Sequence, residues 1–230
     1  MTVPKGQNPT ARGKASRHPW DRLLTDTQDH PPGPFPEKRK RPLDDQISIR
    51  DRIPHPTAGS DETEMGYQCA TCGQQHDGLP DLGWDRPHIF WLIPEEERAG
   101  RIELTSDTCI LDHEHYFIRG VIEIPIVDAT DTFGLGAWVT QKRENFHTYL
   151  DHPDSAAIGP FFGWLSTHIA YYPEETLSLK TRARFRAGHQ RPAIELEPTG
   201  HPLTVDQHNG ITLEKAWEIV HFLLGDEGCV

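Results

Sequence analysis

The sequence predicts an α+β fold, in which a few helices cover a mostly antiparallel sheet. Segments that alternate apolar and polar residues occur in hairpin-like pairs, as antiparallel strands require. Helix-like segments are few and do not alternate with the strands, so a parallel arrangement is not indicated. A change of composition near Met65 separates this folded part from an N-terminal tail.

Residues 1–64 differ in composition from the rest of the chain. They contain ten of the 20 prolines, eleven basic and ten acidic residues, and two aromatic residues, Trp20 and Phe35. A segment with so few apolar side chains cannot offset the entropy that is lost when its backbone becomes ordered. We therefore expect a disordered tail. Residues 65–230 then form a single α+β domain, and Met65 is a candidate for the natural start of the working protein.

Several segments of the folded part show the periodicity of strands or helices. The clearest strand is 115–124, in which Tyr116 lies on one face and Arg119 on the other. Thr212 is a suitable N-cap for a last helix, whose apolar residues recur at helical spacing until Gly225. We also expect strands at 101–104, 108–111 and 133–140, a helix that starts at 94–98, and a helix at 142–150.

Two further segments, 178–186 and 192–197, alternate in the same way and predict a hairpin. A four-residue loop at 188–191 would place Arg184 opposite Glu195, which is a favourable cross-strand pair. The cationic face of the first strand could bind a small anion, although pairing with glutamates explains it more simply. The cations of this face are Lys180, Arg182, Arg184 and Arg186.

Charge and cysteine content exclude several classes of protein. The formal net charge is −12 and the hydrophobic fraction is 35%, so nucleic-acid binding is not expected. No apolar run approaches the roughly 20 residues of a membrane-spanning helix, so we expect no membrane partner. Four cysteines in 230 residues are too few for a disulfide-dense secreted scaffold, and we expect a cytoplasmic protein.

Cys69 and Cys72 have the spacing of half a structural zinc site. A turn of this kind directs two thiolates at one position, and a closed zinc site needs four ligands. Two other interpretations stay open, because the thiols could be buried without a metal or could form a redox pair. The residues that could complete a metal site are His76 and Cys109, which we favour, and His113 or His115.

An enzyme is the alternative interpretation. Segment 112–115 combines acidic and imidazole groups, and Glu197 lies shortly before His201, so either place could support proton transfer. A polar turn and ordinary salt bridges explain the same residues more simply. The glycine-loop, Gly-x-Ser-x-Gly and His-Glu-x-x-His signatures are missing. The candidate catalytic residues are Glu114, His115, Arg119, Glu197 and His201, and whether the chain is an enzyme stays open.

Several stretches between residues 67 and 224 share one resemblance. They include 69–80, 109–120, 162–165 and 191–199. In order and spacing they resemble the bacterial domain of unknown function 2199 family, whose members begin just before the Cys-x-x-Cys motif. The resemblance implies neither an activity nor a cofactor. It places His76, Cys109 and His115 on motif positions, whereas Gly200 replaces an aspartate of the family and His113 replaces a small residue.

Taken together, the residues predict a bacterial binding or regulatory module with a structural zinc ion. Its ligand would be a protein partner or a small anion. The identity of that ligand, the full set of metal ligands and the oligomeric state do not follow from the sequence.

Overall fold

Two long strands, β7 (His115–Pro125) and β8 (Thr132–Gln141), form an antiparallel pair at the centre of the structure. Most of their residues are buried, including Phe117 and Trp138, which are fully inaccessible to solvent. The structure is a computed structural model that describes residues 47–50, 67–69, 72–76, 78–127 and 129–225. These residues all belong to one compact unit, Arg41–Val230.

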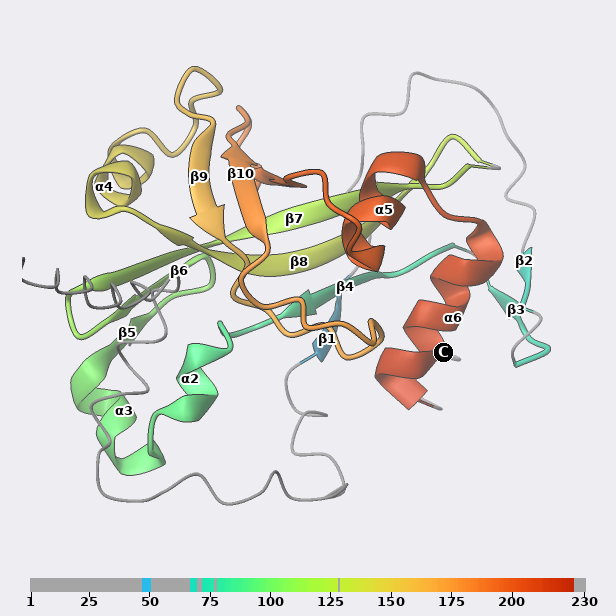
Figure 1. Cartoon of the computed structure of the whole chain (residues 1–230), viewed down its shortest axis with the longest axis horizontal. Coiled ribbons are helices and arrows are strands. Elements are labelled where there is room, and N and C mark those ends of the chain that lie inside the picture. Colours follow the sequence, from blue (N-terminus) through green and yellow to red (C-terminus); the bar gives the residue numbers. More distant parts are fainter. Residues whose placement is uncertain (1–46, 51–66, 70–71, 77, 128, 226–230) are drawn as a thin grey trace, which may run out of the picture. The chain divides into compact units, whose positions relative to one another are not determined.

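Seven shorter strands extend this pair into one sheet (Figure 1). Its main path runs in the order β1-β4-β8-β7-β11-β10-β9, and β6 and β5 continue from β7. Only β4–β8 and β7–β11 are parallel pairs among the described strands, so the predicted mostly antiparallel sheet is confirmed. The strands are β1 (Ile47–Arg50), β4 (Asp81–Trp84), β5 (Ile102–Leu104), β6 (Thr108–Leu111), β9 (Phe161–Trp164), β10 (Lys180–Arg184) and β11 (Ala193–Leu196), with a separate hairpin of β2 (Tyr67–Gln68) and β3 (Gln75–His76).

Five described helices accompany the sheet, as an α+β fold requires. The last helix begins as predicted, because the hydroxyl of Thr212 accepts a hydrogen bond from the Lys215 amide, and it ends at Gly225. None of the helices in the described ranges is long and apolar enough to cross a bilayer. The helices are α2 (Ile89–Leu92), α3 (Glu95–Arg101), α4 (Arg143–Asp151), α5 (Pro202–Asn209) and α6 (Leu213–Leu224).

One edge of β7 is shared by two strands that meet end to end. The antiparallel strand β6 pairs with residues 115–118 of β7, and the parallel strand β11 pairs at Val121. Between them, the amide of Arg119 donates to the carbonyl of Asp107 at 2.8 Å. The amide of Val121 donates to the carbonyl of Pro192 at 2.9 Å, so the hydrogen-bonding edge of β7 continues across the junction.

The sheet also curls until β9 meets β8. Leu165, directly after β9, forms an antiparallel bridge with Val139 of β8, and the Ser166 amide donates to the Trp138 carbonyl at 2.7 Å. Gly163 permits this approach, because a Cβ atom there would lie 2.2 Å from the carbonyl oxygen of Thr140. The sequence predicts β8 but neither β9 nor this closure.

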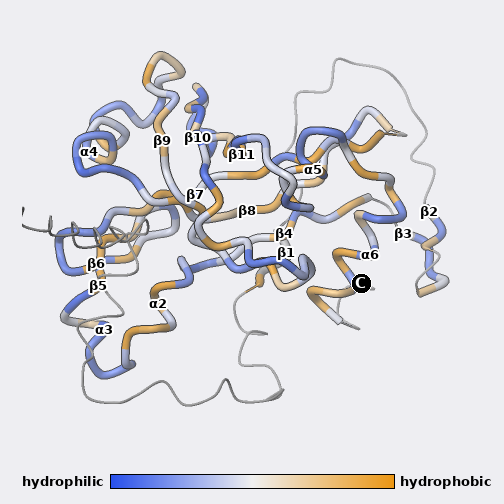
Figure 2. The backbone as a smooth tube through the Cα atoms, in the orientation of Figure 1, coloured by the Kyte–Doolittle hydropathy of each residue, from blue (hydrophilic) through white to orange (hydrophobic). Residues whose placement is uncertain are grey.

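The buried residues follow the hydropathy of the chain. In Figure 2, hydrophobic stretches run along β7, β8 and α6, whereas α3 is hydrophilic for most of its length. On the Tyr116 face of β7, the ring of Phe146 from α4 packs 5.1 Å from Tyr116. Arg119 lies on the opposite face and is nevertheless buried, at 1% exposure, so this face needs partners for a charge.

Two details differ from the sequence-based expectations. Ile47–Arg50 falls within the predicted tail and forms β1, paired with β4, because its apolar residues alternate with polar ones. The rest of 1–64, and Met65, lie outside the described residues. In the β10–β11 hairpin, Arg182 rather than Arg184 lies opposite Glu195, because the loop spans 185–192. This shift of two residues keeps each face, and Arg184 still forms its ion pair with Glu195.

Candidate metal centre

Cys69 and Cys72 lie on the turn that connects β2 to β3. Gln68 pairs with Gln75 in this hairpin, and the Cys69 amide donates to the Gln74 carbonyl at 2.8 Å. The amide of Gly73 donates back to the Cys69 carbonyl, also at 2.8 Å. These bonds hold Cys69 close to Gly73 and Gln74, and the sulfur atoms of Cys69 and Cys72 lie within 4.8 Å of each other.

The third member of the group is His221, which comes from the opposite end of the described chain. It lies on α6, half-buried, with its ring 5.7 Å from the ring of Trp217 one turn earlier. Its Nε2 atom lies 3.1 Å from the Sγ atom of Cys69. One ligand atom from each of Cys69, Cys72 and His221 lies within 4.8 Å of the other two.

This donor set has the chemistry of a zinc or similar soft-metal site. Thiolate sulfur and imidazole nitrogen are the ligands of structural zinc, with bond lengths of about 2.3 Å and 2.0 Å. Atoms within 4.8 Å of one another can surround one ion after small side-chain adjustments. Cys69 is 1% exposed, so an ion there would be shielded from water on at least one side.

The two other predicted metal ligands are His76 and Cys109. The backbone of His76 pairs with that of Tyr67 in the β2–β3 hairpin, but its side chain lies outside the described structure. Cys109 lies on β6, fully buried, and is not part of the three-residue group. Burial raises the pKa of Cys109 to about 12, which disfavours the thiolate that a metal needs. Figure 1 places β6 and the β2–β3 hairpin on opposite sides of the view.

The acidic and imidazole residues at 112–115 form a turn between β6 and β7. Asp112 and His113 both have positive φ angles, and the amide of Glu114 donates to the Leu111 carbonyl. The Asp112 carboxylate accepts two hydrogen bonds from Arg101, which hold its pKa below the ordinary value. Glu114 is exposed, and His115 is half-buried as the first residue of β7. The polar-turn interpretation therefore describes this segment.

Glu197 and His201 serve local structural contacts. Glu197 lies 3.8 Å from the ammonium of Lys180 and 3.6 Å from the guanidinium of Arg182. The Nδ1 atom of His201 accepts a hydrogen bond from the Leu203 amide and so caps α5. Among the described side chains, these two residues do not converge with His115 into a group of potential ligands.

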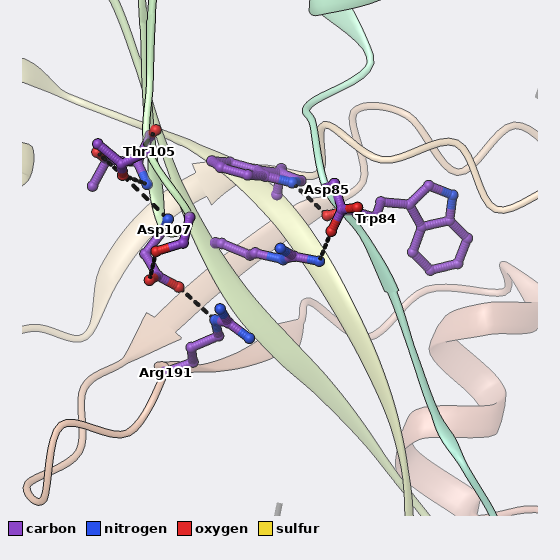
Figure 3. Close-up of polar contacts among 9 residues, drawn as sticks. Trp84, Asp85, Thr105, Asp107 and Arg191 are labelled. Carbon is purple, nitrogen blue, oxygen red and sulfur yellow. Dashed lines mark hydrogen bonds and ion pairs between the residues drawn. The ribbon is translucent and has the colours of Figure 1, made fainter. Parts of the chain in front are cut away.

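Arg119 is more deeply buried than His201, the other buried residue among the proposed catalytic residues. Its Nη2 atom donates to Asp85 at 3.2 Å, and its guanidinium carbon lies 5.9 Å from the centre of the Trp138 ring. The indole of Trp138 in turn donates to the carbonyl of Trp84 at 2.8 Å. Figure 3 shows Asp85 beside Trp84 on one side of this network and Asp107 beside Arg191 on the other. The network accounts for the buried charge without a substrate.

The chain matches the model of one known protein family. A family model described as an uncharacterized protein conserved in bacteria, DUF2199, matches residues 68–211. The chain belongs to the DUF2199 family. No curated protein and no solved structure matches it.

The DUF2199 match contains only part of the metal-ligand group. Cys69 and Cys72 lie within the matched residues, whereas α6 and His221 follow them. Sequence reasoning missed His221 because the chain has 14 histidines and this one is separated from Cys69 by 152 residues. Its place at the border of the apolar stripe of a well-defined helix is the signal that could have selected it.

A second polar network holds α6 within this DUF2199 chain. Asp206 of α5 accepts hydrogen bonds from the Tyr172 hydroxyl at 3.0 Å and from the Lys215 ammonium at 2.7 Å. Burial, together with the charge of Asp206, raises the pKa of Tyr172, so its phenol stays a donor at neutral pH. The Asp206 carboxylate therefore joins the segment around Tyr172 to α5 and to the first turns of α6.

Proposed function

We propose that this DUF2199 protein is a binding module whose C-terminal helix is fastened by a zinc ion. The ion would be held by Cys69 and Cys72 from the β2–β3 turn and by His221 from α6. The observation that carries this proposal is the convergence of these three side chains within 4.8 Å. Two thiols and an imidazole in this arrangement match the ligand types that structural zinc uses.

His76 is the residue that we propose as the fourth ligand. It follows Cys72 by four positions, and its backbone lies in β3 of the same hairpin. A Cys₂His₂ set would close the coordination sphere, as structural zinc sites require, whereas three protein ligands would leave a position for water. The spacing of the motif and the position of β3 support this choice over Cys109, which is part of the core.

A role in binding is favoured over catalysis by the contacts of the candidate catalytic residues. Arg119 forms one ion pair and Glu197 forms two. His201 caps a helix. A group that must exchange protons with a substrate has to remain available to it. The partner of the module would be a protein or a small anion. We also propose a cytoplasmic location, which suits the thiols at Cys69, Cys72 and Cys109.

Metal content of the full chain tests the proposal. Purified protein should contain about one zinc per chain by mass spectrometry, and Cys69→Ser, Cys72→Ser and His221→Gln should each lose most of it. Cys109→Ala is the matched control, because it removes a buried thiol outside the group and should retain the metal. Replacement of zinc by cobalt should give the absorption of a tetrahedral ion with two thiolate ligands.

The alternatives give different results in the same experiment. Wild-type protein without metal after expression in zinc-supplemented medium would contradict the proposal. In that case, a Cys69–Cys72 disulfide found by thiol counting would support the redox interpretation, and unreacted buried thiols would support packing alone. Loss of zinc in Cys109→Ala with an intact fold would show that the ligand set is wrong.

A further inference from the structure

Two arginines of this domain stack on the same pair of aromatic rings. Phe90 and Trp91 on α2 lie edge to face, with ring centres 5.1 Å apart. The guanidinium carbons of Arg86 and Arg98 lie 4.7 Å and 4.6 Å from the centre of Phe90. They lie 5.6 Å and 5.5 Å from the centre of Trp91. Two positive charges are thus held beside the same two rings by neutral partners.

These two arginines differ from most of the other arginines whose side chains the structure describes. Neither Arg86 nor Arg98 forms an ion pair with a carboxylate in the part of the chain that the structure describes. The chain has 35 acidic residues against 23 basic ones, so an arginine without a carboxylate is unexpected. Six described arginines do form ion pairs with carboxylates, namely Arg101, Arg119, Arg182, Arg184, Arg186 and Arg191.

The hydrogen bonds of the cluster leave its donors available. The Nε atom of Arg98 donates to the carbonyl of Ile93 at 3.0 Å, which fixes the side chain and leaves its two terminal nitrogens. The Nε atom of Arg86 and the indole nitrogen of Trp91 also have no acceptor among the described residues, but both atoms are buried, so an anion would contact the terminal nitrogens of Arg86 instead. Stacking on a ring engages the face of a guanidinium and leaves its N–H edge free for an oxyanion.

We propose that Arg86 and Arg98 form a binding site for a doubly charged phosphate group. A phosphate monoester carries a charge of about −1.5 to −2 at pH 7 and has three acceptor oxygens, which suit two guanidinium groups. The phosphate would be free phosphate or the phosphate group of a small monoester, because both present the same oxygens. Phe90 and Trp91 hold the two cations in place before the anion arrives, which lowers the entropic cost of binding.

The acidic start of α3 limits the affinity of this site. Glu95 and Glu96 are exposed in the turn before Arg98, and Glu97 pairs with Arg101 at 2.7 Å. These carboxylates repel a bound anion, but salt screens exposed charges more than it screens half-buried ones. Binding should therefore be measurable at low ionic strength and should require both arginines.

Calorimetric titration of the full chain with inorganic phosphate and with phenyl phosphate tests this site. We expect saturable binding to wild-type protein, at least tenfold weaker binding to Arg86→Gln and to Arg98→Gln, and none to the double variant. Arg143→Gln is the matched control, because it removes the same charge from an exposed arginine at the start of α4, outside the cluster, and should bind as wild type does. Tighter binding of phenyl phosphate would identify a monoester as the ligand, and tighter binding of inorganic phosphate would identify free phosphate.

Other results would overturn the proposal. Absence of saturable binding of both probes to wild-type protein would contradict it, and so would an equal loss of binding in Arg143→Gln. If Arg86→Gln does not fold, Arg98→Lys carries the test, because it keeps the charge but loses the planar fork. Tenfold weaker binding to Arg98→Lys supports the site, and unchanged binding contradicts it.

The phosphate site and the metal centre are tested separately. The proposal here does not depend on the metal, because no residue of the Arg86–Arg98 cluster belongs to the group of Cys69, Cys72 and His221. If Cys69→Ser loses zinc but still binds phosphate, the result supports both the metal centre and the phosphate site. Failure of phosphate binding in a protein with one zinc per chain would contradict only the phosphate site.

Discussion

Asp107 and Arg191 form an ion pair, with Nε of Arg191 donating to Oδ1 of Asp107 at 2.5 Å, across a separation of 84 residues. The pair lies where β6 and β11 meet on one edge of β7 (Figure 3). Asp107 immediately precedes β6, and Arg191 lies two residues before β11. The ion pair thus joins a local hairpin to a strand that arrives from a distant part of the chain.

Removal of this ion pair should destabilise the domain. Asp107→Asn is expected to lower the free energy of unfolding by about 1–2 kcal/mol, because a partly buried charge-assisted hydrogen bond is lost. The measurement is urea denaturation of both proteins at pH 7. The exposed pair of Arg184 and Glu195 provides the control, since Glu195→Gln should cost less than about 1 kcal/mol. Equal losses in the two variants would contradict a special role for Asp107.

The same variant should change how stability depends on pH. Burial alone would raise the pKa of Asp107, but hydrogen bonds from Ser106 and Arg191 and the charge of Arg119 outweigh it and hold the pKa below 3.8. The unfolded chain therefore binds this proton at a higher pH than the folded one. The stabilisation is present above pH 3.8 and is lost as the pH falls through the folded-state pKa. The difference in unfolding free energy between wild type and Asp107→Asn should therefore become smaller as the pH is lowered from 3.8 through the folded-state pKa. Unfolding measured at a series of acidic pH values checks this.

Gly120 should not tolerate a side chain. A Cβ atom there would lie 2.5 Å from the side chain of Ile194 and 2.6 Å from the Pro192 carbonyl, so β11 could not remain against β7. Gly120→Ala is expected to cost at least 1–3 kcal/mol, roughly the range for overpacking, in thermal or urea unfolding. Gly100→Ala on α3 is the control, because no atom lies within 4 Å of the added carbon. It should stabilise α3 by roughly 0.5–1 kcal/mol.

Replacement of His76 should weaken metal binding without abolishing it. With Cys69, Cys72 and His221 in place, His76→Asn keeps three ligands and should bind zinc at least tenfold more weakly in a competition titration with a chelator. The cobalt spectrum should change because water takes the fourth position. His113→Asn is the control, since that exposed residue contacts Glu103. An unchanged zinc affinity in His76→Asn would show that His76 is not a ligand.

Asp206 should couple energetically to Lys215. Lys215→Met leaves the carboxylate of a residue that is 6% exposed without its cation, while Asp206→Asn removes the charge itself. Each single variant is expected to lose about 1–3 kcal/mol of unfolding free energy. The double variant should lose less than the sum of the two, by roughly 0.5–3 kcal/mol. Additive losses would mean that the two groups act independently.

Local pattern sufficed to predict most elements of this fold. Strand 115–124 and the helix after Thr212 follow from periodicity and capping, which depend on neighbouring residues only. The curling of the sheet depends instead on the approach of Gly163 to Thr140, and no local pattern encodes it. The register of the β10–β11 hairpin was predicted two residues away from the observed one, because charge pairing along one face fits both registers.

Only half of the candidate metal centre could be predicted from the sequence. The Cys69–Cys72 spacing is a local signal, whereas the choice of further ligands requires knowledge of which distant segments meet. Cys109 was favoured for its chemistry, but its strand lies in the core and its thiol is outside the ligand group. Arg119 was selected as a catalytic candidate because the sequence does not reveal that Asp85 and Trp138 surround it.

The contact between Cys69 and His221 also bears on the order of events during synthesis. The ribosome makes Cys69 first and reaches His221 152 residues later. At about 5–20 residues per second, that interval is roughly 8–30 s. The contact can form only after all of the described strands have been made, because the last of them ends at Leu196. A chain that lacks α6 cannot acquire the contact, so the cysteine turn depends on a helix that is synthesised after the whole described sheet.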